Sequence, residues 1–300
     1  MSAASIARTL GGTGQSRSGW YSCNCPVCCG EAKLGIKDVV GGLAVNCFKL
    51  CRRTDILAEL ERLGVLNGEL GEPEDPHRAA QRRAKEEAET RRRVAEARDF
   101  VANECLSWNT TGQIARYLRS RVIDPSALPT SIMWHGLMRH PEGGQRPLMI
   151  GVIEHVELGI IGATRTFLAA DGSQKASFRK PRLFLGVASG GAVRLGAVNP
   201  RVELVVGEGI ESTLSYMQLY GLPGWAALSA NGIKNLVLPP EARRIVIAAD
   251  NDRNGTGWKA AVAAARKWVF EGRRVRIDMP PIIGTDWNDV LLSRGVGHAA

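Results

Sequence analysis

The stretch Val-Glu-Leu-Val-Val-Gly-Glu-Gly-Ile-Glu-Ser (202–212) sets the pattern that decides the fold. A short run of branched apolar residues ends at an acid, Glu208, and a helix-like segment at 212–220 follows. Apolar runs of this kind are typical of strands that are buried on both faces. The stretch therefore predicts a buried strand, an acid at its carboxyl end and a helix that leads back.

The same order recurs at 244–255, Arg-Ile-Val-Ile-Ala-Ala-Asp-Asn-Asp-Arg-Asn-Gly. Here the apolar run ends at Asp250 and Asp252, and a helix-like segment at 257–271 follows. Strand, acid and helix in repetition predict an α/β fold, with a parallel sheet covered by helices. Ligands of such sheets bind beyond the carboxyl ends of the strands, which is where these acids fall.

A third acidic cluster, Gly-Thr-Asp-Trp-Asn-Asp-Val-Leu (284–291), contains Asp286 and Asp289. Several carboxylates held together repel one another unless cations lie between them. Oxygen ligands favour Mg²⁺ or Mn²⁺ over zinc. The three clusters together predict a magnesium-dependent site for phosphoryl transfer.

Four motifs carry a resemblance to a known family: Glu-Gly-Ile-Glu (208–211), Trp-Ala-Ala-Leu-Ser-Ala (225–230), Ile-Ala-Ala-Asp-Asn-Asp (247–252) and Asp-Trp-Asn-Asp (286–289). Together they resemble the TOPRIM domain, which bacterial-type primases, type IA and type II topoisomerases and some nucleases share. The match is closest to the branch found in phage and plasmid primase-like proteins. It covers about 90 residues, the size of one domain, and we assign 201–300 to it.

The resemblance implies a role for each acid. Glu208 is the general acid/base and a magnesium ligand, Asp250 and Asp252 hold Mg²⁺, and Asp286 completes the metal shell. Many related primases have a further acid where Asn288 stands, so the chain carries less negative charge there. Glycines on both sides of Glu208 are expected to leave room for a phosphate.

Six of the seven cysteines fall within 29 residues, namely Cys23, Cys25, Cys28, Cys29, Cys47 and Cys51. The pairs Cys25/Cys28 and Cys47/Cys51 suit two knuckles that hold one tetrahedral Zn²⁺. Cys23 or Cys29 could replace a member of the first pair. Strands at 33–36 and 43–46 would connect the knuckles, and a helix over 55–63, capped by Thr54, would follow.

Residues 1–66 thus predict a zinc-binding domain, and they resemble the zinc ribbon at the head of bacterial-type and phage primases. Residues 67–108 predict a connector: a flexible joint, then a long helix from His77 to Trp108 that contains no glycine or proline. The apolar stripe that begins at Val94 is expected to dock on the next domain.

Residues 109–200 predict an α+β domain, and the hundred residues 101–200 carry the largest basic surplus of the chain, 11 basic against 6 acidic residues. A helix is expected at 114–121, and strands at 147–154, 159–167 and 182–185. By resemblance to related primases, this domain supplies cations to the nucleotide and the template. Arg165, Lys175 and Arg182 are the candidates, with Arg165 and Lys175 facing the acids.

The 300 residues carry a net charge of +9, and 44% are hydrophobic and 23% charged, which predicts a globular protein with a polyanionic partner. The sequence has no membrane-spanning run and no signal peptide, so we expect a cytoplasmic protein. A Gly-x-x-x-x-Gly-Lys-Ser/Thr motif does not occur, so any replicative helicase would be a separate chain.

These features and the resemblance predict a DNA primase that makes short RNA primers on single-stranded DNA from ribonucleoside triphosphates. Two alternatives remain at this stage. One is a TOPRIM nuclease, and the other is a non-catalytic, zinc-containing DNA-binding protein of a mobile element. A topoisomerase is not expected, because the chain has no room for a gate domain with a nucleophilic tyrosine.

Overall fold

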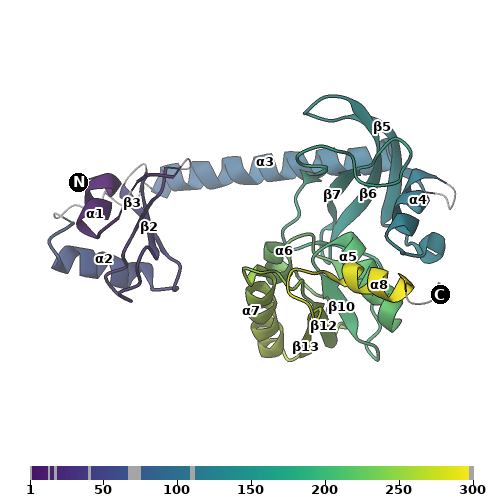
Figure 1. Ribbon diagram of the computed structural model, residues 1–300. Coiled ribbons are helices and arrows are strands. Elements are labelled where there is room, and N and C mark those ends of the chain that lie inside the picture. Colours follow the sequence, from purple (N-terminus) through teal and green to yellow (C-terminus); the bar gives the residue numbers. More distant parts are fainter. Residues whose placement is uncertain are drawn as a thin grey trace. The chain divides into compact units, whose positions relative to one another are not determined.

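The computed structural model of the chain describes residues 2–12, 14–16, 19–39, 42–66, 76–108 and 112–296 (Figure 1). The chain divides into two compact units, 1–87 and 88–300, and the division falls within one helix. Apart from Pro76, the joint expected at 67–76 lies outside the described residues. Within the described ranges, none of the helices has the length and apolar character that a bilayer crossing requires.

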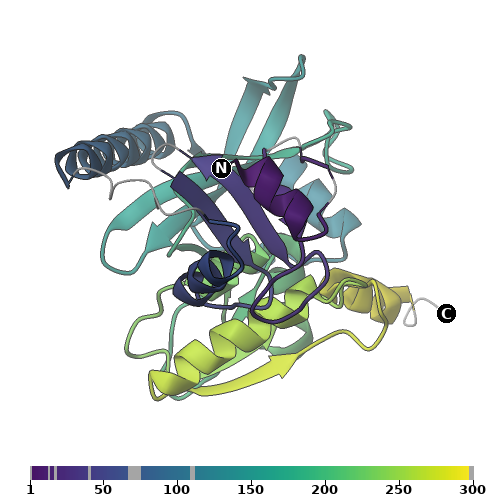
Figure 2. The ribbon, with the colours of Figure 1, turned by 90° about the vertical axis from the view of Figure 1, so that its left-hand side faces the viewer.

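The first unit is built on an antiparallel sheet in the order β1-β2-β3. Leu34 pairs with Cys47, so their side chains share one face of the sheet. Ile6 of α1 and Ile56 of α2 are buried against that face, so both helices cover the same side (Figure 2). The elements are α1 (Ala3–Thr9), β1 (Tyr21–Cys23), β2 (Leu34–Val39), β3 (Gly42–Cys47) and α2 (Arg53–Arg62).

The predicted strands at 33–36 and 43–46 are confirmed as β2 and β3, but the predicted cap of α2 is wrong. The helix begins at Arg53, and Thr54 lies inside it with its hydroxyl bonded to Asp55. Arg52 is the N-cap and makes no side-chain capping bond. The helix therefore starts two residues after Cys51, without the serine- or threonine-type cap that was expected.

Helix α3 (Pro76–Asn103) contains the division between the units. Its apolar stripe behaves as predicted: Ala97 and Val101 are buried in the second unit, and Val94 packs against that unit's core. The helix ends five residues before the predicted end at Trp108. Leu106 and Ser107 form the short strand β4 instead, because their backbone pairs with Trp134 and Met133.

One ten-stranded sheet organises the second unit. Eight of its strands follow the order β13-β12-β10-β11-β9-β6-β5-β4, while β7 pairs with β6 and β8 pairs with β7. The strands are β4 (Leu106–Ser107), β5 (Ile132–Arg139), β6 (Gln145–His155), β7 (Gly159–Phe167), β8 (Arg182–Gly186), β9 (Ala192–Arg194), β10 (Leu204–Gly207), β11 (Gly224–Ala226), β12 (Arg244–Ala248) and β13 (Arg274–Asp278). Strands β10 to β13 are parallel to one another, as predicted, and the remaining strands pair antiparallel.

Helices cover both faces of the parallel part. Ile245 and Ile247 of β12 face α7, where Trp268 is fully buried. Val246, one residue out of phase, faces Tyr216 of α5 on the other side. These helices are α5 (Ile210–Tyr220), α6 (Ala230–Asn235), α7 (Thr256–Phe270) and α8 (Trp287–Val296).

The antiparallel part contains the predicted strands at 147–154, 159–167 and 182–185 as β6, β7 and β8. The predicted helix at 114–121 is α4 (Gln113–Ser120), and a turn of 3₁₀-helix, η1 (Pro125–Ala127), follows it. The sequence analysis missed the eight-residue strand β5, six residues of which pair with β6. A register shift between His135 and Met138 interrupts its alternation of buried and exposed residues.

Candidate active site and zinc-binding cluster

The acids predicted from the sequence lie along one edge of the sheet, the edge formed by the carboxyl ends of its parallel strands. Strands β10 and β12 are parallel, and Gly207 lies opposite Ala248, so Glu208 and Asp250 emerge side by side after the strands end. Asp252 follows two residues later, and Asp286 directly precedes α8. We call Glu208, Asp250, Asp252 and Asp286 the edge acids.

The edge acids act on one another electrostatically. Burial raises the pKa of Asp250 to about 7, and the negative charges of Glu208, Asp286 and Asp252 add to this rise. Burial and the charge of Asp252 also raise the pKa of Glu208. Opposite charge would lower these pKa values, so the edge acids form a site that attracts cations.

A serine that the sequence analysis did not single out holds Asp250 in place. The hydroxyl of Ser212 donates a hydrogen bond to Oδ1 of Asp250 at 3.1 Å. The same hydroxyl accepts a bond from the backbone N–H of Trp287 at 3.3 Å. Ser212 thereby connects the end of β12 to the start of α8. Its position in the first turn of the helix after β10 is the sequence feature from which this role could have been predicted.

Two glycines near the edge acids allow neighbouring segments to pack closer than a side chain would permit. A side chain on Gly257 would meet the carbonyl oxygen of Asp250 at 2.5 Å, and its N–H donates to Oδ2 of Asp252 at 3.1 Å. A side chain on Gly207 would meet Oγ1 of Thr213 at 2.3 Å. Gly207 therefore serves the packing of α5 against β10, whereas a side chain on Gly209 would meet no atom closer than 3.8 Å.

Asp286 is the N-cap of α8. Its Oδ1 accepts the N–H groups of Asn288 (2.8 Å) and Asp289 (3.0 Å), and its own N–H donates to Asp289. Asn288 is fully buried and donates to the carbonyl of Arg121 and the hydroxyl of Ser215. The amide of Asn288 thereby links α8 to α4 and α5.

Lys175 pairs with an acid, but not with an edge acid. Its Nζ lies 2.9 Å from Oε1 of Glu211, which also accepts a 2.6 Å hydrogen bond from the hydroxyl of Tyr117. Although burial opposes the charge, Lys175 and Tyr117 lower the pKa of Glu211 to about 2. Lys175 also lines a polar cavity of about 390 Å³ with Tyr117, Ser120, Arg121, Ser173 and Gln174.

Of the two arginines predicted to bind the nucleotide or DNA, only Arg182 acts on the edge acids. Its positive charge lowers the pKa of Glu208 against the effect of burial. Arg182 lies opposite Thr166 on neighbouring strands, so it shares a face of the sheet with Thr164 and Thr166.

The expectation that Arg165 faces the acids is wrong. One residue out of phase with Thr164, it lies on the other face of β7. There it contacts Sδ of Met138 and the carbonyl of Phe184, both at 3.5 Å, and burial lowers its pKa while Glu104 opposes the shift. Whether an arginine can reach the acids depends on the face of the sheet to which its side chain points, and composition does not reveal that face.

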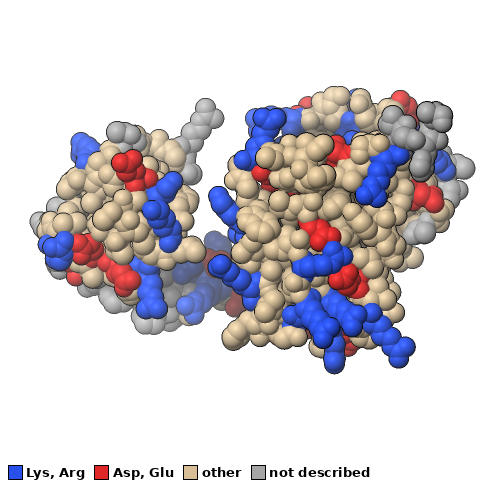
Figure 3. Space-filling model, turned by 60° about the horizontal axis from the view of Figure 1, so that its bottom comes forward, with Lys and Arg blue, Asp and Glu red and all other residues tan. Residues whose placement is uncertain are grey.

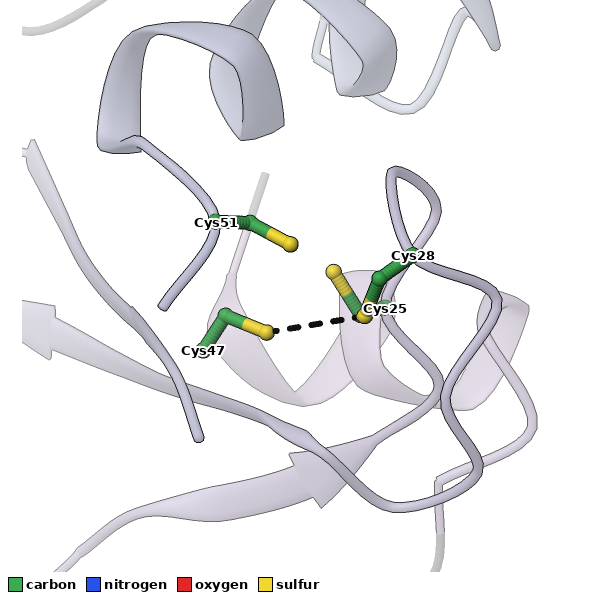
Figure 4. Close-up of side chains that lie close together, drawn as sticks. All are labelled: Cys25, Cys28, Cys47 and Cys51. Carbon is green, nitrogen blue, oxygen red and sulfur yellow. Dashed lines mark hydrogen bonds between the residues drawn. The ribbon is translucent and has the colours of Figure 1, made fainter. Parts of the chain in front are cut away.

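The first unit brings together the four cysteines predicted as zinc ligands. Cys25 and Cys28 come from a turn, Cys47 ends β3, and Cys51 precedes α2 (Figure 4). Their sulfur atoms all lie within 4.8 Å of one another. Among the described residues, this is the only group of three or more His, Cys, Asp or Glu side chains that meets this spacing. Four sulfur ligands in such a group fit a structural Zn²⁺.

The remaining two cysteines of this unit lie outside the group. Cys23 is buried, donates to the carbonyl of Leu34, and has its pKa raised to about 11 by burial. Cys29 is exposed. Within the group, burial raises the pKa of Cys47, but the N–H groups of Lys49 and Cys51 outweigh it and bring the pKa to about 7. A thiolate is therefore accessible near neutral pH for metal binding.

The carboxylate oxygens of the edge acids lie further apart than the cysteine sulfurs: no three of these acids bring their oxygens within 4.8 Å of one another. The donor atoms are all carboxylate oxygens, and two of the acids carry raised pKa values. This donor set fits Mg²⁺ or Mn²⁺.

Comparison with protein families identifies the class. Residues 203–297 match the model of the Toprim domain, and residues 87–195 match a domain of unknown function. The chain therefore contains a Toprim domain, as the motifs predicted, preceded in the sequence by a four-cysteine cluster that fits zinc. No curated protein is significantly similar to the chain.

Solved structures of primases resemble the chain at low identity. The DnaG primase catalytic domain bound to ssDNA is 16% identical over 69% of this chain and 78% of that chain, with a TM-score of 0.45. The zinc-binding and RNA polymerase domains of the Aquifex aeolicus primase are 13% identical over 97% and 80%, with a TM-score of 0.45. The primase fragment of the bacteriophage T7 primase-helicase protein is 16% identical over 92% and 96%, with a TM-score of 0.43. These likenesses are too distant to say anything about activity.

The raised pKa of Asp250 predicts a pH-dependent stability of the metal-free protein. The folded state holds the Asp250 proton up to about pH 7, whereas the unfolded state releases it near its ordinary pKa of 3.8. Stability should therefore fall as the pH rises from about 4 to 7, and Asp250→Asn should remove this loss. At pH 8 we expect the variant to melt about 5 °C above the wild type, a difference on the order of 2 kcal/mol after allowance for partial exposure.

Thermal unfolding at pH 5 and pH 8, without metal, measures this effect. The difference between the two proteins should be smaller at pH 5 and should shrink at pH 8 when Mg²⁺ is added, because a bound cation stabilises only the wild type. A difference that stays constant with pH would contradict the assignment of the cost to the Asp250 carboxylate.

Proposed function

We propose that the chain is a DNA primase, a nucleotidyltransferase that joins ribonucleotides into short primers on single-stranded DNA with Mg²⁺ or Mn²⁺. One observation carries the proposal: the half-buried Asp250 lies beside Glu208, Asp252 and Asp286, and the cation Arg182 acts on the same site. A cation-attracting edge next to an arginine suits a triphosphate, which brings its own metal ions to the protein.

The edge acids divide the chemistry between them. Glu208, Asp250 and Asp252 would hold Mg²⁺, which lowers the pKa of the attacking 3′-hydroxyl and neutralises charge on the triphosphate. Glu208, whose pKa is raised by burial, is also suited to exchange a proton during the reaction. Asp286 holds the start of α8 in place and adds negative charge beside Asp250. Arg182 would bind a phosphate oxygen and offset the charge that develops during transfer.

The polar cavity beside the Lys175–Glu211 pair is the place proposed for further phosphate contacts. Lys175 is 39% exposed, so its ammonium group remains accessible while Glu211 and Tyr117 fix its position. Glu211 balances its charge in the absence of ligand, and a phosphate oxygen could share the same ammonium hydrogens. Lys175 is thus proposed as a nucleotide contact, and Arg165, on the other face of β7, is not.

The four-cysteine unit is proposed to contact the template, and a separate replicative helicase is the expected partner. The exposed side chains near the cluster include Phe48, Lys49 and Arg52, a mixture of aromatic and cationic groups that suits a single strand. One of the similar structures belongs to a primase-helicase protein, and another is a complex with ssDNA.

One assay separates the proposed function from its rivals. The protein is given labelled single-stranded DNA, ribonucleoside triphosphates and Mg²⁺, and the products are resolved by size. New short RNA that requires all four components is the expected result. Shortened DNA would identify a nuclease, and a shift of the DNA without any product would identify a binding protein; either result would refute the primase.

A further inference from the structure

A second charged feature lies at the opposite end of the parallel strands from the edge acids. A shallow groove of about 250 Å³ opens where β12 and β13 begin, and we call it the arginine groove. Figure 3 brings the side on which these strands begin toward the viewer and shows Lys and Arg side chains gathered there. The groove is lined by Glu203, Arg244, Ile245, Arg274, Val275 and Arg276.

Two arginines of the groove lie side by side, and within the described residues no carboxylate forms an ion pair with either of them. Arg244 lies directly opposite Arg274 on the neighbouring parallel strand, so both side chains share one face of the sheet. Both are exposed, and within the described part of the chain neither forms an ion pair. Like charges in register destabilise a sheet, so this arrangement does not serve stability.

The acid of the groove is already occupied. Glu203 accepts two hydrogen bonds from Arg276, from Nε and Nη2, each 3.0 Å long. Arg276 also forms an ion pair with Asp278 of the same strand, and its bonds to Glu203 and Asp278 raise the pKa of Arg276 above its ordinary value. Arg276 is therefore fixed, whereas Arg244 and Arg274 keep their hydrogen-bond donors free for an anion.

The groove is separate from the candidate active site. Asp250 follows Arg244 by six positions of extended chain, which corresponds to about 20 Å. A ligand that contacts both must be a long polyanion, because a nucleotide is too short to bridge this distance. An arginine fork is matched to phosphate oxygens, and cations without base-reading partners bind the backbone independently of sequence.

We propose that the arginine groove binds the phosphate backbone of DNA at a second site, at the opposite end of the parallel strands from the edge acids. Arg244 and Arg274 each contact a phosphate, and the strand passes along the start of β12 and β13. The choice of DNA as the polyanion rests on the proposed function, but binding at the groove requires neither the acids nor Mg²⁺.

Binding of labelled DNA to the full chain, without Mg²⁺ or nucleotides, tests the proposal over a range of salt concentrations. The double variant Arg244→Ala/Arg274→Ala loses two phosphate contacts. Its slope of log affinity against log salt should fall by about 1.4 on single strands, with a roughly 10- to 30-fold weaker affinity near 0.1 M salt. Single-stranded and duplex DNA are tested separately, and the larger loss shows which of them the groove holds.

Two further variants separate binding from folding. Arg266→Ala removes an exposed arginine of α7, on the other face of the sheet, and should leave affinity and slope nearly unchanged. Arg274→Glu places an acid opposite Arg244, so it should keep or raise the unfolding temperature while weakening DNA binding more than Arg274→Ala does.

The proposal is overturned if the double variant and Arg266→Ala bind both kinds of DNA with the same affinity and salt slope, which is also the outcome expected if the groove held an acidic protein. It is equally overturned if Arg274→Glu folds and binds as the wild type does. Absence of primer synthesis by the wild type would refute the proposed function but not the binding of DNA at the groove, because the binding assay does not depend on catalysis.

Discussion

Asp250→Asn should abolish primer synthesis while the protein still folds and binds DNA. The substitution keeps the size of the side chain and its contact with Ser212, but it removes the charge at the centre of the edge acids. A metal ligand in the transition state cannot be replaced by a neutral amide at comparable strength, so we expect synthesis to fall roughly 1,000-fold or more. The measurement is the rate of short RNA formation on single-stranded DNA at saturating nucleotide.

Asp124→Asn provides the matched control. Asp124 is exposed and caps the 3₁₀-turn η1, a role that asparagine fills equally well, so synthesis should remain at the wild-type rate. Substantial synthesis by Asp250→Asn would show that the reaction occurs elsewhere on the protein. Loss of DNA binding together with synthesis would mean that the substitution had damaged more than the metal site.

Removal of zinc should unfold the first unit and leave the second unit folded. The core of the first unit is small, and a structural Zn²⁺ contributes roughly 10–16 kcal/mol to modules of this kind. Because the chain divides into two compact units, the loss should stop within the first. Hydrogen exchange followed by mass spectrometry should show β2 and β3 losing protection in a chelator, while β10 and β12 keep theirs.

Cysteine variants locate the zinc. Cys47→Ser should lower the zinc content from about one per chain to near zero, because a tetrahedral site with three sulfurs binds far more weakly. Cys29→Ser, an exposed cysteine outside the group, should keep the full zinc content. The opposite result, zinc retained in Cys47→Ser and lost in Cys29→Ser, would contradict the assignment of the four ligands.

The sequence was sufficient where the signal is local. Each acid that ends an apolar run, Glu208 and Asp250 among them, could be placed at the sheet edge because parallel strands end at the same side. The zinc ligands could be chosen in the same way, because two short-spaced pairs joined by a hairpin bring the sulfurs together.

Other features depend on contacts between distant parts of the chain. Whether Arg165 or its neighbour Thr164 faces the acids is decided by strand phase, which a residue count cannot supply. One partner of Glu211, Tyr117, lies 94 residues away in α4, and the other, Lys175, lies on a loop. No spacing in the sequence indicates either of them. Strand β5 escaped prediction because its register shift breaks the alternation on which strand prediction depends.

The direct test of the account is the binding of Mn²⁺ to the protein, followed by electron paramagnetic resonance and competed with Mg²⁺. Zinc remains in the first unit during this measurement, so Mn²⁺ reports on the edge acids. The wild type and Asp124→Asn should bind Mn²⁺ and release it to excess Mg²⁺, whereas Asp250→Asn should lose this binding. Equal binding by all three proteins would show that the edge acids do not hold the metal, and the proposed chemistry at the sheet edge would be wrong.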